Sequence, residues 1–196
     1  AEYLGLTVKA KVVDGEKVYN KQVLQIVSGD AQTILTMERT MLNLMSRMSG
    51  IATQTNSLAQ KLEGAGLKAK VAATRKSAPG LLYFDKKAVL IGGGDAHRLH
   101  LDDMVLIKDN HLAIVGSVEG AIKKAQESGS FSKKIEVEVS SLEDALQAAS
   151  SQADGERGRT LDEIGDRLGL GEIELAVQEG ALAELARSRR PRTQLQ

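Results

Sequence analysis

The residues best suited to chemistry gather in one segment, from Leu67 to His111. This segment holds all three histidines of the chain, and its eight Lys and Arg residues outnumber its five Asp and Glu residues. The whole chain, in contrast, carries 26 basic and 26 acidic residues and no formal net charge. A local excess of fixed cations suits the binding of a small anion. Anion binding is therefore the first function that the sequence indicates.

Two short motifs in this segment carry cations. Thr74, Arg75 and Lys76 directly follow an apolar run, where a turn would direct side chains toward a ligand. Arg75 suits bidentate binding of a carboxylate or phosphate, with Lys76 as a point charge beside it. The run IGGGDAHR lacks the Lys-Ser/Thr of a P-loop, but it offers close backbone approach to a ligand and ends in His97 and Arg98. A solvated Arg-Lys pair and a structural histidine are the simpler alternatives.

Two further motifs add a lysine and two carboxylates. LIKDNH places Lys108 at the end of an expected strand, although its polar residues could simply cap the next segment. IEVEVSS places Glu136 and Glu138 on the same face of a strand, because side chains alternate. Two carboxylates aimed the same way need a metal or cationic partners unless that face is solvated. Glu136 and Glu138 are therefore candidate metal ligands.

The elements that position these motifs follow from hydrophobic periodicity. Two strands are expected in LTVKAKVV and KQVLQIVSGD, and a long amphipathic helix from Ala31 to the glycines of EGAGL, its methionine-rich stripe forming core. Three further strands are expected in LKAKVAA, DDMVLIKD and KKIEVEVS, and three helices in GLLYFDKKAVLI, SVEGAIKKAQES and SLEDALQAASS. This alternation predicts a parallel sheet or (β/α) barrel, with the polar motifs at the carboxyl strand ends, where ligands bind.

The predicted fold class is α/β, with an N-terminal α/β sandwich domain and an incomplete (β/α) barrel that is truncated or altered after about residue 150. Residues 1–66 are expected to form the N-terminal domain, whose natural start lies before Ala1, and residues 67–150 a partial barrel that carries the site. Residues 151–196 are expected to be a divergent helical or disordered tail, with EIELAVQEGALAELA as its helix. The tail lacks the apolar run that a next barrel strand requires.

Composition argues against several classes of protein. Balanced charge, two Phe, three Tyr and no Trp make general or single-strand nucleic-acid binding unfavourable. The longest apolar runs are far short of a membrane span, so neither a nucleic acid nor a membrane is an expected partner. The absence of cysteine excludes disulfides and thiolate metal sites, and it suits a reducing compartment. We therefore expect a cytoplasmic protein.

Several segments together resemble one family. In order and spacing, four segments resemble motifs of the quinolinate phosphoribosyltransferases: ERTMLNLMSRMSGIAT, AATRKSAPGL, DKKAVLIGGGDAHRLHLDDMVLIKDNHL and KIEVEVSSLEDAL. The resemblance covers about residues 1 to 150. It implies a pentosyltransferase that moves phosphoribosyl from phosphoribosyl pyrophosphate to quinolinate with loss of CO2. The product, nicotinate mononucleotide, serves NAD biosynthesis. The resemblance also implies Mg2+ with phosphoribosyl pyrophosphate, no organic cofactor, and a homodimer or higher homo-oligomer.

The resemblance implies a role for each candidate residue. Lys108 would lie near the reacting centre and the pyrophosphate, and Glu138 would face the ribose and metal with Glu136 beside it. These two, Lys108 and Glu138, would be catalytic as well as substrate-binding. The other substrate-binding residues would be Thr74, Arg75, Lys76, His97 and Arg98, joined by Arg39 from a partner subunit.

The chain also departs from this family. Leu82 stands where the family continues PGLR with an arginine. After Ser151 there is no recognisable strand ending in Leu-Asp-Asn, and none of the glycine-rich loops that hold the phosphate. Two alternatives therefore stay open. One is a catalytically inactive or fragmentary homologue that acts as a binding or assembly partner, and the other is a phosphoribosyltransferase-like protein associated with molybdenum transport.

Overall fold

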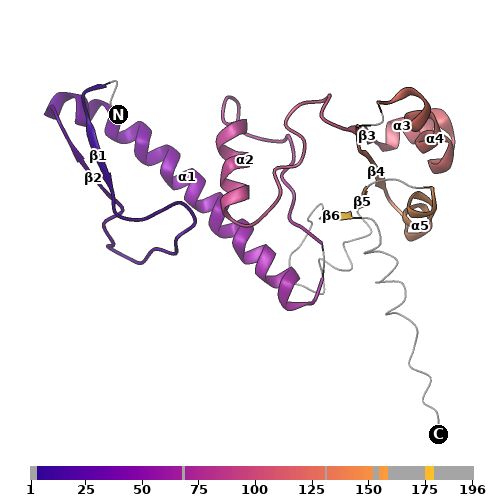
Figure 1. Cartoon of the computed structure of the whole chain (residues 1–196), viewed down its shortest axis with the longest axis horizontal. Helices are drawn as coiled ribbons and strands as arrows, with labels where there is room; N and C mark the ends of the chain where they lie inside the picture. The colour runs from indigo at the N-terminus through magenta and orange to yellow at the C-terminus, as the bar shows by residue number, and fades with distance from the viewer. Residues whose placement is uncertain (1–3, 68, 131, 152–154, 159–174, 179–196) are drawn as a thin grey trace, which may run out of the picture.

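The computed structural model describes residues 4–67, 69–130, 132–151, 155–158 and 175–178. It begins with an antiparallel pair of strands, β1 (Thr7–Ala10) and β2 (Gln25–Ser28), followed by the long helix α1 (Ala31–Gly64). Helix α2 (Leu82–Ile91) packs against α1, at a distance from the two strands (Figure 1). Two of the strands and two of the helices expected from periodicity are therefore present.

Helix α1 starts and stops where local sequence favours it. The side chain of Asp30 accepts a hydrogen bond from the Thr33 backbone N–H at 2.9 Å, which caps the helix and holds the Asp30 pKa below its ordinary value. At the other end Gly66 has a φ of +69°, a conformation that glycine adopts readily. The methionine stripe, however, is only half-buried, and the buried side chains of α1 are Thr55 and Leu62.

An ion pair fixes α2 on α1. The guanidinium of Arg47 donates two hydrogen bonds to the carboxylate of Asp85, at 2.7 and 2.8 Å. The same hydrogen bonds from Arg47 hold the pKa of the Asp85 carboxyl below its ordinary value. Asp85 is nearly buried, so this bidentate contact ties α2 to the long helix at a specific point.

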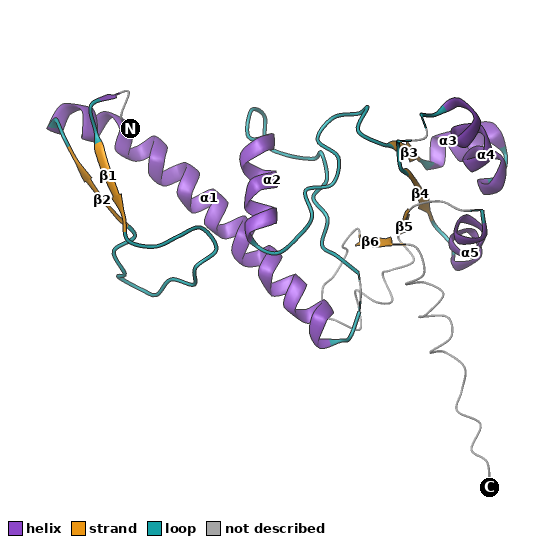
Figure 2. Ribbon diagram, viewed as in Figure 1, coloured by secondary structure: helices purple, strands orange, loops and turns teal. Residues whose placement is uncertain are grey.

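The second part of the chain is a four-stranded sheet with helices packed on it (Figure 2). Its elements, in chain order, are β3 (Val105–Ile107), α3 (Asp109–Val115), α4 (Val118–Ser128), β4 (Ile135–Val139), α5 (Leu142–Ser150), β5 (Gly155–Gly158) and β6 (Leu175–Gln178). The strand order is β3-β4-β5-β6, with β3, β4 and β5 parallel and β6 antiparallel to β5. Ile107, the last residue of β3, pairs with Val137, so β4 extends two residues beyond the end of β3.

The hydrophobic core lies between this sheet and helices α4 and α5. Its buried members are Ile107, Val118, Ala121, Ile122, Ile135, Val137, Val139, Ala145 and Ala148. Val118, Ala121 and Ile122 have the three- and four-residue spacing of one helix face, which explains why α4 covers the sheet. Because residues of β3 and β4 are packed in this core, the backbone that carries the polar residues at their carboxyl ends is held in place.

Three predictions about secondary structure were wrong. LKAKVAA holds isolated bridge residues, among them Ala72 paired in parallel with Asp95, and its described residues form no extended strand. Strand β5 exists without an apolar run, because a ladder needs only backbone N–H and C=O groups. Strand β6 lies inside the segment expected to be helical, where pairing with β5 overrides local propensity. The remainder of the expected tail, residues 159–174 and 179–196, lies outside the described residues.

The domain boundaries at residues 66 and 150 stay predictions. None of the helices described is both long enough and apolar enough to cross a membrane.

Candidate functional site

A single parallel bridge brings the two cationic motifs side by side. The N–H of Asp95 donates to the Val71 carbonyl at 2.8 Å, and the N–H of Ala73 donates to the Asp95 carbonyl at 2.8 Å. Because the two segments run parallel here, the chain leaves both in the same direction. One segment continues into the Thr74 turn and the other into the His97 turn. The bridge thus places the starts of the two cationic turns next to each other.

Lys86 makes hydrogen bonds to both of the segments that lead into the cationic turns. This lysine of α2 is only 3% exposed. Its Nζ donates to the Ala73 carbonyl at 3.4 Å and to the Ala96 carbonyl, the residues that immediately precede the two cationic turns. No motif pointed to Lys86. Its one signal is its register, four residues after Leu82 and three before Val89, on the apolar side of the helix.

Two of the three glycines in the run pack against protein, whereas an added Cβ at Gly93 would have nothing within 4 Å. A Cβ at Gly92 would lie 2.5 Å from the carbonyl oxygen of Ala52, and a Cβ at Gly94 would lie 2.8 Å from that of Val71. Glycine is therefore needed for the close approach of this run to α1 and to the bridged segment. The close approach that the structure shows is to protein, whereas the approach to a ligand that the sequence suggested stays a prediction.

His97 faces the sheet. Its backbone has a φ of +52°, and its N–H donates to the Asp95 carboxylate at 2.7 Å. The imidazole Nε2 lies 2.6 Å from Oε2 of Glu136, and the two side chains are only 11% and 6% exposed. One of the two candidate carboxylates of β4 is thereby engaged with the histidine.

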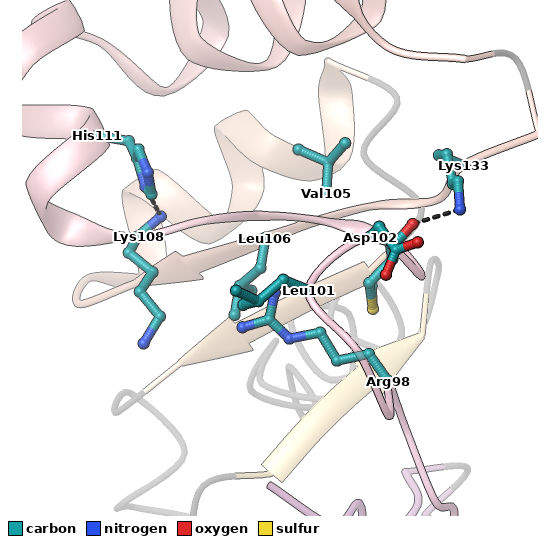
Figure 3. A pocket seen from close by; sticks show the side chains of 9 residues that line it. Arg98, Leu101, Asp102, Val105, Leu106, Lys108, His111 and Lys133 are labelled. Carbon is teal, nitrogen blue, oxygen red and sulfur yellow. Dashed lines mark hydrogen bonds between the residues drawn. The ribbon is translucent and has the colours of Figure 1, made fainter. Parts of the chain in front are cut away.

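Arg98 and Lys108 line one open hollow of about 410 Å³. Figure 3 shows the two side chains reaching it from different segments, Arg98 from the loop before β3 and Lys108 from the end of β3. The Lys108 ammonium lies 3.8 Å from Oε2 of Glu138, and these side chains are 45% and 23% exposed. The charges of Lys108 and Glu138 are therefore accessible to a ligand. The rest of the lining comes from Leu101, Asp102, Met104, Val105, Leu106, His111 and Lys133.

Two local caps order the segment around the hollow. The backbone N–H of Lys108 donates to Nδ1 of His111 at 2.9 Å, a bond drawn in Figure 3. The Asp103 carboxylate accepts hydrogen bonds from the N–H groups of His100 and Leu99 at 2.8 and 2.7 Å, which hold its pKa below the ordinary value. The capping interpretation of LIKDNH thus applies to His111, whereas the Lys108 side chain remains directed at the hollow.

The structure brings some predicted site residues together and leaves others apart. Arg75 and Lys76 are exposed on the neighbouring turn, where Lys76 N–H donates to the Thr74 hydroxyl at 3.0 Å, and they do not line the hollow. Arg39 is exposed in the third turn of α1, in the half of the helix that lies away from β3 and β4 (Figure 1). Within the described ranges, no group of three or more His, Cys, Asp or Glu residues could hold a metal ion.

Comparison with known proteins identifies one family. Residues 2–49 match the N-terminal domain of quinolinate phosphoribosyl transferase, and residues 51–165 match its C-terminal domain. A probable nicotinate-nucleotide pyrophosphorylase (carboxylating) of Methanothermobacter thermautotrophicus is 51% identical over 141 residues, which are 72% of this chain and 50% of that protein. The human nicotinate-nucleotide pyrophosphorylase (carboxylating) is 40% identical over 141 residues, 72% of this chain and 48% of that protein.

Solved structures agree with the sequence comparison. The nicotinate-nucleotide pyrophosphorylase of Francisella tularensis matches with a TM-score of 0.68 at 38% identity, over 76% of this chain and 52% of that one. The structure of NadC from Streptococcus pyogenes matches with a TM-score of 0.69 at 38% identity, over 76% of this chain and 52% of that one. This confirms the predicted fold class. The chain spans about half the length of the curated relatives it matches.

Proposed function

Because the chain belongs to the quinolinate phosphoribosyltransferase family, we propose that it transfers phosphoribosyl from phosphoribosyl pyrophosphate to quinolinate. The transfer is accompanied by decarboxylation and yields nicotinate mononucleotide, pyrophosphate and CO2 for NAD biosynthesis. One observation carries this proposal: Arg98 and Lys108, from two different segments, line the same hollow. The relatives' names favour this reaction over the alternative associated with molybdenum transport.

The cations suit the acid substrate. Quinolinate is a dicarboxylate, so holding it in one orientation needs more than one fixed cation. The parallel bridge directs the Arg75 turn and the Arg98 turn the same way, and the buried Lys86 ties both together. We assign substrate binding to Thr74, Arg75, Lys76, His97 and Arg98, with Arg39 contributed by a second copy of the chain.

The Lys108 and Glu138 pair suits the transfer step. Breaking the bond between ribose and pyrophosphate develops positive charge at the anomeric carbon and negative charge on the leaving group. A carboxylate and an ammonium 3.8 Å apart, both partly exposed, can stabilise these opposite charges without reorganising. Glu138 would face the ribose, and Lys108 the leaving pyrophosphate.

We also propose that Mg2+ accompanies the pyrophosphate group, and no organic cofactor is proposed. Magnesium usually binds through one or two carboxylates plus substrate phosphates, so a single partly exposed carboxylate, Glu138, fits this role. Glu136, which faces His97, is the less suitable of the two predicted ligands. When bound, the ion would neutralise charge on the leaving pyrophosphate.

Kinetics of two variants test the proposed roles. Arg75→Ala should raise the KM for quinolinate about 10-fold with kcat little changed, because it removes one charge-assisted contact to the substrate. Lys108→Met should lower kcat about 100-fold with the quinolinate Kd little changed, because its charge acts mainly on the leaving group. Mononucleotide formation with and without Mg2+ gives the kinetic values, and calorimetry gives the Kd. Lys123→Ala, an exposed lysine on α4, is the control.

Each outcome separates the candidates. Unchanged kinetics in both variants would contradict the assigned roles. Quinolinate binding without product would instead favour the inactive binding-partner alternative. Wild-type chain that neither binds quinolinate nor forms product would refute the proposed function.

We further propose that the chain assembles as a homodimer or a higher homo-oligomer. Large apolar side chains are exposed on its N-terminal part, and a second copy could cover them. They are Leu4, Val8, Val13, Val18, Tyr19, Val23, Ile26, Leu35 and Leu42. No nucleic-acid or membrane partner is proposed, and the cytoplasmic location stays a prediction.

Sedimentation velocity tests this assembly. Leu35 is 71% exposed, and Leu35→Asp should shift the chain toward monomer because a buried charge in an apolar interface is costly. Ile114→Asp is the matched control, since Ile114 is 85% exposed on α3, outside this N-terminal surface. A wild-type chain that stays monomeric at every concentration would contradict the proposal.

A further inference from the structure

Glu136 and His97 form a nearly buried pair that joins the cationic loop to the sheet. Their 2.6 Å contact links a strand residue of β4 to the loop residue immediately before Arg98. Glu136 pairs in register with Leu106 of β3, two residues before Lys108. The pair therefore connects the segment that carries Arg98 to the strands that carry Lys108 and Glu138.

The backbone around His97 is held in an uncommon conformation. His97 is one of two non-glycine residues with positive φ in the part of the chain that the structure describes. Asp95 accepts its N–H, and Lys86 donates to the preceding carbonyl, of Ala96. Such a conformation persists only where the surroundings over-determine it, and these conformations cluster at functional sites. Here the conformation turns the imidazole toward β4 while the chain continues into the hollow.

From these contacts we infer that Glu136 is a positioning residue, which acts through His97 to hold Arg98 in place at the hollow. The inference rests on the proposed function, because a ligand with two carboxylates needs Arg98 at a fixed distance from the other quinolinate-binding cations. A carboxylate that accepts a hydrogen bond from one imidazole nitrogen fixes both the ring orientation and the nitrogen that carries the proton. Because an ionised carboxylate can only accept a hydrogen bond, the inference assigns the proton of this contact to Nε2 of His97.

The inference also explains why a carboxylate is tolerated beside a site for anions. An exposed carboxylate there would repel quinolinate. Glu136 is only 6% exposed at its side chain, and the imidazole lies against it, so its charge is kept from the hollow. Removing the imidazole alone should therefore weaken binding more than removing both groups.

Glu136→Leu, Glu136→Gln, His97→Ala and the double variant His97→Ala/Glu136→Gln test this role in the full chain. Glu136→Leu should weaken quinolinate binding about 100-fold and Glu136→Gln, which retains an acceptor oxygen, about 10-fold. Nicotinate, with one carboxylate, should lose much less affinity in both variants. The double variant should bind quinolinate more tightly than His97→Ala. Glu143→Gln, an exposed glutamate on α5, is the control.

The nitrogen chemical shifts of the His97 imidazole, measured without ligand at one pH, give an independent readout. We expect the Nε2–H signature in the wild-type chain, its retention in Glu136→Gln and its loss in Glu136→Leu. Unchanged shifts in Glu136→Leu, or equal losses of quinolinate and nicotinate affinity, would overturn the inference. If the wild-type chain binds no quinolinate, the proposed function fails, while the imidazole shifts still decide whether Glu136 positions His97.

Discussion

Lys86→Met should raise the quinolinate Kd about 100-fold while lowering the free energy of unfolding by only about 1–2 kcal/mol. The buried ammonium donates to the Ala73 and Ala96 carbonyls, which directly precede the two cationic turns. Methionine fills a similar volume but donates no hydrogen bond. The turns would then lose their common anchor, and a displacement of about 1 Å is enough to cost such a factor.

The size of the stability loss reflects two opposing terms. Two carbonyls lose a charged donor, which is destabilising, while the cost of burying an ammonium disappears, which is stabilising. Lys87→Met is the matched control. Lys87 is the adjacent residue, 63% exposed at its side chain, and its 3.7 Å ion pair with Asp14 is at the surface. If Lys86→Met bound quinolinate as tightly as Lys87→Met does, the anchoring role of Lys86 would be refuted.

Gly92→Ala should lower the free energy of unfolding by about 3 kcal/mol, the upper range for overpacking. The added Cβ would lie 2.5 Å from the Ala52 carbonyl oxygen and 2.7 Å from Cβ of Thr55. Neither neighbour is the far end of a flexible side chain, and Thr55 is buried, so α2 would have to move away from α1. Urea unfolding followed by circular dichroism measures the change.

A second glycine gives a control with the opposite sign. Gly50 lies inside α1, and an added Cβ there would have nothing within 4 Å. Gly50→Ala should therefore stabilise the chain by about 0.5–1 kcal/mol, through helix propensity alone. Two variants of the same chemistry should thus move the unfolding midpoint in opposite directions. A Gly92→Ala chain as stable as the wild type would show that the close packing of the glycine run is not required.

Local patterns predicted the elements well where periodicity and caps agree. Helix α1 runs from Ala31 to Gly64, as its apolar spacing and flanking glycines indicated. Helices α2, α4 and α5 and strands β3 and β4 were also expected, because each buries one side of an amphipathic pattern. Strands β5 and β6 were not, since long-range pairing of backbone groups leaves no local pattern in the sequence.

The sequence by itself determined which residues could form the site and the strand ends on which they lie. Only the tertiary structure decided their partners. Glu136 and Glu138 share one strand face, and no pattern separates them, yet the first meets His97 and the second meets Lys108. Likewise Lys86 is one of two adjacent lysines, and packing alone buries it beneath both cationic turns. Such pairings depend on how distant segments pack, whereas periodicity reports only which face of an element a residue occupies.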